Sequence, residues 1–311
     1  MDERERVARF YVDAWRRRAA ACRGEVHEVG RLVVCLTGAP AAWFNATLVI
    51  EDGPGIEDDL RAARGVYPPG LGFGIEVLPE LQRSARRAVE AAGFHVIEGS
   101  PVMNLDIDAL AAPPPPDGVE LVEITDPAGL DAVAATDAAG FGGDAGVTRR
   151  FLADGVLEDP TQRVYAAMSD GEMVGAGETS LADGVLGVFG VTTVPGARRR
   201  GIGAALTAYM IAERADEADL ATLDASELGR GVYERLGFRT VTIDFVSGVE
   251  PCYVLDRVDV AYGADTVTIT LFEGNDPTAG DVACIEIGVF KRTIVTLDEP
   301  LGDRTIVDGA A

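Results

Sequence analysis

The sequence is poor in lysine, histidine and cysteine, and these shortages exclude some classes of site. Lys291 is the only lysine, so arginine carries almost all of the positive charge. The two histidines and four cysteines show no Cys-x-x-Cys pair and no spacing suited to zinc. We therefore expect no metal site, and we interpret the cysteines as thiols of a reducing cytoplasm.

The chain also lacks long apolar runs and an excess of positive charge. No segment approaches the ~18 apolar residues that a membrane helix needs. With 51 acidic and 27 basic residues the formal net charge is −24, which repels nucleic acids and anionic membranes. We therefore expect neither as a partner. The same field attracts a cationic ligand, although acidity that serves only solubility explains the charge as well.

What the sequence does contain is enough apolar residues for more than one core. Its 311 residues, 47% of them hydrophobic, suit two domains and a small appendage. The run AAPPPPD at Ala111–Asp117 has four consecutive prolines, which remove backbone donors and stiffen a linker. The predicted organisation is a domain at 1–112, a linker at 113–118, a second domain at 119–248 and a tail at 249–311.

Periodicity in the second domain predicts a mixed α/β sheet with helices on both sides. Antiparallel strands, two of them joined by a hairpin turn at Asp170-Gly171, precede a strand–helix–strand crossover and a further helix and strand. The expected strands are 119–125, 163–168, 173–181, 185–194, 220–224 and 238–246, and the expected helices are 128–139, 148–157, 203–213 and 230–236.

The first half and the tail give weaker patterns. Residues 44–110 repeat the order strand, helix, strand, helix, and Ala92-Gly93-Phe94 stands where the second half has Leu236-Gly237-Phe238. The tail alternates in the β manner, and a small β unit of this kind needs packing or a Cys252–Cys284 disulfide to be stable. The expected elements are helices at 3–20 and 81–92, strands at 31–36, 44–50, 265–272 and 284–297, and two short strands within 93–108.

The most informative segment follows the strand at 185–194. A Pro-Gly turn leads to three arginines and then to Gly201-Ile202-Gly203, which opens a helix. Free amides and the helix dipole favour an anion there by ~0.3–1 kcal/mol per charge. Glycine lets a phosphate group touch the backbone, although the glycines also suit close helix packing. Leu206 replaces the third glycine of a dinucleotide fingerprint, and no Gly-Lys-Ser/Thr run exists for a P-loop.

Two motifs in this half resemble those of one enzyme superfamily. Arg198-x-x-Gly201-x-Gly203 after a strand is similar to the pyrophosphate motif of the GNAT N-acetyltransferases, Gln/Arg-x-x-Gly-x-Gly/Ala. Downstream, Tyr233-Glu234-Arg235-Leu236-Gly237-Phe238 resembles the family's Tyr-x-x-x-Gly-Phe signature. The resemblance covers residues 119–248 and implies acetyl-CoA as co-substrate and transfer of its acetyl group to an amine.

The resemblance also implies roles for individual residues. Tyr233 would protonate the departing CoA thiolate, the alternative being a plain core residue. Ser226 stands where many members carry an asparagine that contacts the cofactor, and its hydroxyl still forms hydrogen bonds. Main-chain groups would hold the pantetheine arm at Val191, Thr193 and Val194, and the diphosphate at Arg198, Arg199, Arg200, Gly201, Ile202 and Gly203.

The proton of an ammonium acceptor has to be removed before attack, usually by a carboxylate. Glu178, on the strand beside the cofactor strand, and Glu227, after the next strand, are the candidates; the alternative is that both are solvated surface acids. We expect direct attack in a ternary complex by the amine of a small, cationic molecule or a peptide. A CoA-binding sensor without turnover and an acyl group such as succinyl are alternatives, and a homodimer is compatible with the sequence.

The first half lacks the cofactor motif. Around residues 54–64 no Arg-x-x-Gly-x-Gly occurs, and Glu57, Asp58 and Asp59 stand at the helix start, where they would repel a diphosphate. We therefore predict two GNAT-like domains in tandem, the first of them degenerate, free of cofactor and placed as a wall of the acceptor site. An unrelated α/β partner domain is the alternative.

Overall fold

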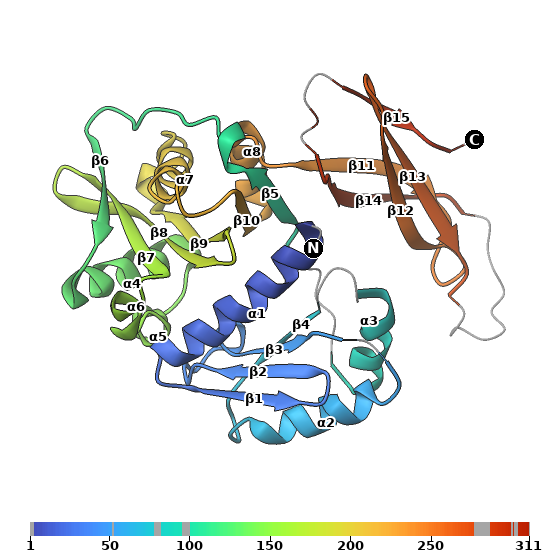
Figure 1. The fold of residues 1–311 in the computed structure, drawn as a ribbon, viewed down its shortest axis with the longest axis horizontal. Helices are drawn as coiled ribbons and strands as arrows, with labels where there is room; N and C mark the ends of the chain where they lie inside the picture. Colours follow the sequence, from blue (N-terminus) through green and yellow to red (C-terminus); the bar gives the residue numbers. More distant parts are fainter. Residues whose placement is uncertain are drawn as a thin grey trace. The chain divides into compact units, whose positions relative to one another are not determined.

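The structure is a computed structural model of the chain, and it describes residues 3–51, 53–77, 82–94, 100–276, 287–299, 301 and 304–310 (Figure 1). It divides into two compact units, Met1–Ser100 with Asp106–Leu223, and Pro101–Leu105 with Asp224–Ala311. These limits differ from the sequence-based domain boundaries, which stay a prediction. No described helix is long and apolar enough to cross a membrane.

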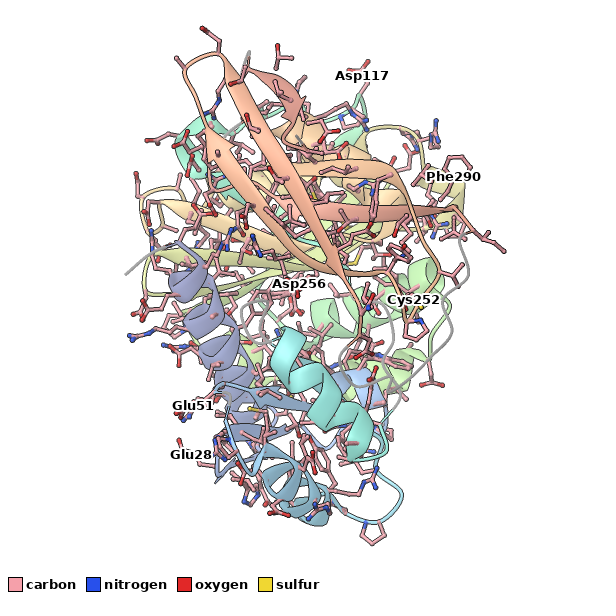
Figure 2. All side chains as sticks on the ribbon, turned by 90° about the vertical axis from the view of Figure 1, so that its right-hand side faces the viewer. Glu28, Glu51, Asp117, Cys252, Asp256 and Phe290 are labelled. Carbon is pink, nitrogen blue, oxygen red and sulfur yellow. The ribbon has the colours of Figure 1, made fainter. Side chains whose placement is uncertain are left out.

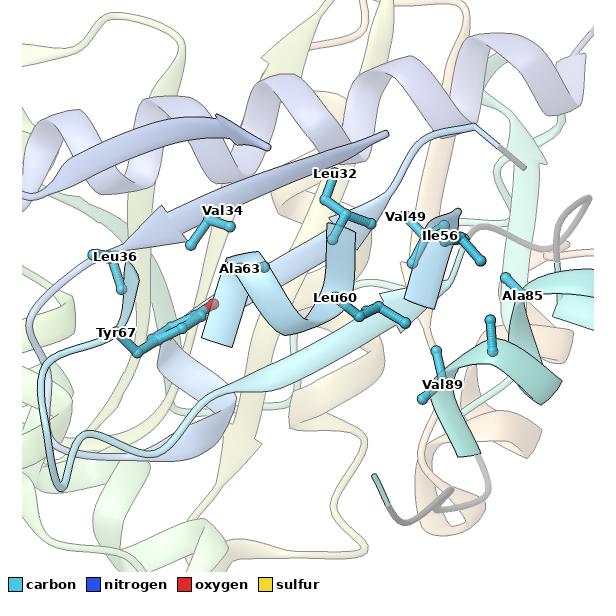
Figure 3. Close-up of a cluster of buried hydrophobic side chains, with 11 residues drawn as sticks. Leu32, Val34, Leu36, Val49, Ile56, Leu60, Ala63, Tyr67, Ala85 and Val89 are labelled. Atoms are coloured by element: carbon cyan, nitrogen blue, oxygen red, sulfur yellow. The ribbon is translucent and has the colours of Figure 1, made fainter. Parts of the chain in front are cut away.

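The first sheet of the first unit has the strand order β1-β2-β3-β4. Its first two pairings are antiparallel and the third is parallel, because α2 carries the chain across between β3 and β4. Alternate residues of β2 point to one face, where helices α2 and α3 cover them (Figure 3). The elements are β1 (Glu25–Val29), β2 (Leu32–Leu36), β3 (Ala46–Val49), α2 (Ile56–Val66), β4 (Gly74–Val77) and α3 (Gln82–Ala91).

The second sheet of this unit repeats that plan with an extra edge strand. Within this unit its order is β10-β9-β8-β7-β6, with antiparallel pairs from β6 to β9 and a parallel pair between β9 and β10. Positive φ at Asp170 and Gly171 forms the predicted hairpin turn. The elements are β6 (Val119–Ile124), β7 (Gln162–Ser169), β8 (Glu172–Ala182), β9 (Val185–Thr193), α7 (Ile202–Ala212) and β10 (Leu220–Asp224).

Three helices follow β6, where two were expected. Asp126 caps α4 (Pro127–Phe141) and Asp144 caps α5 (Ala145–Phe151). Each carboxylate accepts a hydrogen bond from the backbone N–H three residues further along the chain. The single helix predicted at 148–157 is wrong: α5 ends at Phe151 and α6 (Gly155–Glu158) is separate. The Arg149 guanidinium donates to the Leu152 carbonyl (2.6 Å) and so stabilises the break.

Helix α1 (Glu3–Ala21) packs against both sheets of the first unit. It contacts β1 and β2 of the first sheet and β8 and β9 of the second (Figure 1). Phe10 on α1 stacks on Phe189 of β9 with ring centroids 6.0 Å apart. Gly187 leaves room for it, since a Cβ there would lie 2.1 Å from the Phe10 ring. The N-terminal helix is therefore part of the core beneath β9.

The second unit contains β5 (Val102–Asp106), α8 (Glu227–Leu236) and a β-rich remainder. Strand β14 pairs with β11 from Thr240↔Thr296 to Ser247↔Val289, which joins segments on both sides of the predicted boundary at 248. Cys252 is disulfide-bonded; Cys284 lies outside the described residues, so its predicted pairing is not described. The other strands are β11 (Thr240–Ser247), β12 (Val254–Tyr262), β13 (Thr266–Gly274), β14 (Val289–Thr296) and β15 (Thr305–Asp308).

Candidate active site

The predicted anion-binding loop connects β9 to α7 through the short helix η4 (Pro195–Ala197). Gly201 enters α7 with φ +85°, and Arg199 also has a positive φ, +64°. A left-handed conformation is uncommon for a residue with a side chain. Where left-handed and right-handed residues alternate, successive backbone N–H groups point to the same side and form a concave surface that binds anions. The backbone of this loop therefore has the shape that the motif predicts.

The amides of this loop are free to bind a ligand. Among the described residues, the N–H groups from Arg199 to Ala204 have no acceptor, and no side chain caps α7. A Cβ at Gly203 would meet only Thr193 Oγ1, at 3.7 Å, so packing within the protein does not require glycine there. A phosphate group lying on the helix start would require it. The loop thus fits a diphosphate.

The three arginines of the loop have different surroundings. Arg198 Nε donates to the Thr193 carbonyl (3.0 Å), and its Nη2 donates to the Gly140 carbonyl at the end of α4 (2.6 Å). Arg198 therefore fixes the loop against β9 and α4. Arg199 and Arg200 are exposed and form no ion pair with any described residue. They leave a positive patch on a strongly acidic chain.

Strand β9 has a free edge before this loop. Its last pair with β10 is Thr222↔Gly187, and it continues to Thr193 past a bulge opposite Gly177. The N–H of Val194 donates to Val174 of β8 (3.0 Å), so the main-chain groups of Thr193 point away from β8. Thr193 and Val191 lie on this free stretch, where the Thr193 carbonyl also accepts from Arg198 Nε. Val194 differs, because both its N–H and its carbonyl already have partners within the chain.

Helix α8 carries three of the predicted residues. Ser226 caps it, accepting from the Gly229 N–H (3.1 Å), so the helix begins earlier than predicted, with Glu227 exposed in its first turn. Tyr233 is 8% exposed, and burial raises its pKa to about 12. The phenol therefore keeps its proton throughout the neutral range. Gly229 is needed beneath the ring, because a Cβ there would lie 2.9 Å from Tyr233 Cε2.

The loop and α8 fall within one known family. Residues 146–248 match the family described as the acetyltransferase (GNAT) domain. The chain contains a GNAT acetyltransferase domain. Its matched range includes the loop at Arg198–Gly203 and the helix that carries Tyr233, and so confirms the resemblance inferred from these two motifs.

Solved structures extend the likeness beyond the GNAT domain. A GCN5-related N-acetyltransferase from Kribbella flavida shares 23% identity and a TM-score of 0.60, over 76% of this chain and 92% of that one. A functionally unknown conserved protein from Staphylococcus epidermidis shares 16% identity and a TM-score of 0.52, over 68% and 88%. At such identities the likeness shows the fold alone. No curated protein matches the chain significantly. The two sheets are consistent with the predicted tandem arrangement.

Glu178 of the GNAT domain is not a solvated surface acid. It lies on β8 opposite Phe189 and is 8% exposed. Its Oε2 accepts from Arg18 Nη2 at 2.6 Å, and Arg18 belongs to α1. The Arg18 guanidinium also lies 4.5 Å from the centre of the Phe151 ring. The first half of the chain thus supplies the counter-ion of a predicted catalytic carboxylate, over a sequence separation that no local motif reveals.

Asp137, on α4 before the range that matches the GNAT family, is a carboxylate that the sequence analysis did not single out. It is half-buried on α4, and Thr148 Oγ1 donates to its Oδ1 (3.2 Å). Burial raises its pKa; the Thr148 hydrogen bond lowers it, and the charge of Glu178 raises it further, to about 6. The available sequence signal was its place on the apolar stripe of the helix, after Leu130, Val133 and Ala134.

Proposed function

We propose that the chain transfers an acetyl group from acetyl-CoA to the amine of a small, cationic molecule or peptide. The observation that carries the proposal is the row of free amides from Arg199 to Ala204, at the start of a helix and beside two unpaired arginines. Such a row binds the diphosphate of a CoA thioester. The free edge of β9 at Val191 and Thr193 would hold the pantetheine arm by main-chain hydrogen bonds.

The proposed reaction is a direct attack of the amine on the thioester carbonyl. An ammonium group loses a proton to a carboxylate, for which Glu178 and Glu227 are the candidates from the motif order. The C–N bond then forms as the C–S bond breaks, and the nitrogen gives up its second proton to solvent. Tyr233 donates its phenol proton to the departing thiolate and regains one from solvent. The raised pKa of Tyr233 keeps this proton in place at neutral pH.

Charge supports a cationic acceptor. The net charge of −24 comes from many exposed carboxylates, among them Glu28, Glu51, Asp117 and Asp256 (Figure 2). A negative field raises the local concentration of polyamines, aminoglycosides and basic peptides. The proposal places the enzyme in the cytoplasm, where free thiols such as Cys22 and Cys35 persist. The disulfide bond of Cys252 departs from the expectation that all the cysteines are thiols. A homodimer stays a prediction, which sedimentation of the purified chain tests.

The first experiment separates cofactor binding from turnover. Calorimetric titration with acetyl-CoA is followed by a thiol-release assay with spermidine, an aminoglycoside and a lysine-rich peptide. We expect binding, and CoA release with at least one amine. Gly203→Val should weaken acetyl-CoA binding by about 10-fold or more, because its side chain fills the phosphate position. Gly196→Val, where a Cβ meets no atom within 4 Å, is the matched control.

Each outcome of this experiment has a definite meaning. Binding without release across the amine panel favours a CoA sensor. A protein that ignores acetyl-CoA at millimolar concentration, or a Gly203→Val variant that binds it as well as the control, contradicts the proposal.

A further inference from the structure

Asp137 occupies a core-facing position of α4 close to the cofactor strand. Gly140, one turn further along the helix, packs so tightly on β9 that a Cβ there would lie 1.8 Å from Thr192 Oγ1. The same turn of α4 accepts from Arg198 of the diphosphate loop. Residues three apart share a helix face, so Asp137 lies on the side of α4 that carries this contact. Thr192 directly follows the bulge of β9.

Burying a charged carboxylate at such a position costs free energy unless it is paired with a positive charge or hydrogen-bonded. Thr148 is the hydrogen-bond donor to Asp137 among the described residues, and no basic side chain there forms an ion pair with it. The charged groups around it are engaged elsewhere. Arg18 pairs with Glu178, and Arg149 pairs with Asp131 and Asp154.

The other carboxylates suit the role of base less well. The Oε2 atom of Glu178 is held by Arg18, and its side chain is buried. Glu227 is exposed in the first turn of α8, with the positive end of the helix dipole beside it. Asp137 keeps a carboxylate without a cationic partner, and its neighbour Glu178 is fixed in place. An incoming ammonium group would supply the missing positive charge.

We propose that Asp137 is the residue that takes the proton from the attacking amine, and that Arg18 and Glu178 are positioning residues beside it. This inference rests on the proposed acetyl transfer and specifies its base. One proton moves from the ammonium nitrogen to an Asp137 oxygen, and the freed lone pair forms the C–N bond. The C–S bond breaks, and the nitrogen gives up its second proton to solvent. The thiolate takes the Tyr233 proton, and Asp137 releases its own to solvent.

The electrostatic surroundings suit this role. Burial and the Glu178 charge together outweigh the Thr148 hydrogen bond and raise the pKa of Asp137 to about 6. Cys22, the residue that follows α1, also has its pKa raised by burial, so it stays a neutral thiol. Tyr11 of α1 lies against the Phe189 ring of β9. A carboxylate with such a pKa is a stronger base than an ordinary one and is still mostly ionised at neutral pH. Strand β9 contributes no titratable side chain.

The test compares the pH dependence of kcat/KM for wild type, Asp137→Asn and Asp137→Glu with spermidine and acetyl-CoA. The wild type should lose activity below a midpoint near pH 6. Asp137→Asn should lower kcat by roughly 10²- to 10⁴-fold, lose that midpoint and bind acetyl-CoA unchanged by calorimetry. Asp137→Glu should recover part of the activity. Asp131→Asn, an exposed position on the same helix, is the control and should match the wild type.

A second acceptor separates proton removal from a structural effect. Methoxyamine is neutral at pH 7 and needs no base, so Asp137→Asn should impair its acetylation much less than that of spermidine. Equal losses with both amines, or an acid limb that survives in Asp137→Asn and disappears in Glu178→Gln, overturn the assignment of Asp137 alone. A wild type that binds acetyl-CoA and acetylates no amine overturns the proposed function, and this inference with it.

Discussion

In both halves of the chain a parallel crossover enters its helix through a left-handed glycine, Gly55 (φ +91°) before α2 and Gly201 (φ +85°) before α7. The charges that follow are opposite. The first turn of α2 contains Glu57, Asp58 and Asp59, whereas α7 follows three arginines and has no acid in its first turn. Asp59 accepts from both the Arg31 amide and its guanidinium (2.7 Å). The first helix start therefore carries its own anions, and the second is open to a ligand.

Helices α3 and α8 show the same contrast. Gly93 and Gly237 end α3 and α8 with positive φ, and the next residue, a phenylalanine in both, donates its N–H five residues back. The acceptor is Val89 in the first half and Tyr233 in the second. A buried valine thus stands where the GNAT domain has its phenol. The same backbone features thus occur in both halves of the chain, while the groups suited to acetyl transfer occur in the second.

The largest expected effect comes from removing the phenol that distinguishes α8 from α3. Tyr233→Phe should lower kcat by roughly 10²- to 10⁴-fold, because general acid help to the thiolate is lost. The affinity for acetyl-CoA should stay nearly unchanged, as measured by calorimetry. Tyr253→Phe, at an exposed tyrosine, is the control. An unaltered kcat would remove Tyr233 from the mechanism, and α8 would then carry no catalytic group that α3 lacks.

A smaller effect should follow when the second helix start is given the charge of the first. Arg199→Glu together with Arg200→Glu should weaken acetyl-CoA binding by roughly 10- to 1000-fold, since two favourable charge interactions become unfavourable. The loss should shrink at high salt, because both positions are exposed. Arg150→Glu, at another exposed arginine, should bind normally. Equal affinities of the two variants would show that the loop charge is irrelevant to the ligand.

The smallest expected effect is a gain in stability. Asp137 has a pKa of about 6 in the fold and an ordinary value of 3.8, so its ionisation opposes folding above pH 6, and the penalty vanishes below about pH 4. Asp137→Asn should therefore raise the melting temperature at pH 8, by about 2–4 °C for a half-buried group, with no gain at pH 4. Thermal melts at both pH values measure this. A variant that melts lower at pH 8 would indicate a structural carboxylate.

Local patterns were sufficient for most elements and for the ligand loop. Helix α1, strand β2 and the Asp170-Gly171 hairpin lie close to where periodicity and turn chemistry placed them. The broken helix near Leu152 and strand β12 were not foreseen. The first depends on a side-chain bond from Arg149. Strand β12 is half-exposed and contains several charged residues, which weaken the alternation of apolar and polar residues that predicts a strand.

The candidate site was foreseen where it depends on neighbouring residues and missed where it depends on tertiary contacts. The loop from Arg198 to Gly203 is a continuous motif, and its free amides follow from the start of a helix. The pairing of Glu178 with Arg18 joins residues 160 positions apart. Asp137 acquires its raised pKa from burial and from Glu178, neither of which a sequence pattern reveals.

Helix α1 makes the first hundred residues inseparable from the catalytic sheet. A fragment that begins after the proline linker would lose Phe10, which fills the space above Gly187, and Arg18, which neutralises Glu178. Such a fragment would keep every motif of the acetyltransferase and yet expose an apolar hollow and a bare buried charge. A truncation guided by the motifs alone would therefore yield an insoluble product.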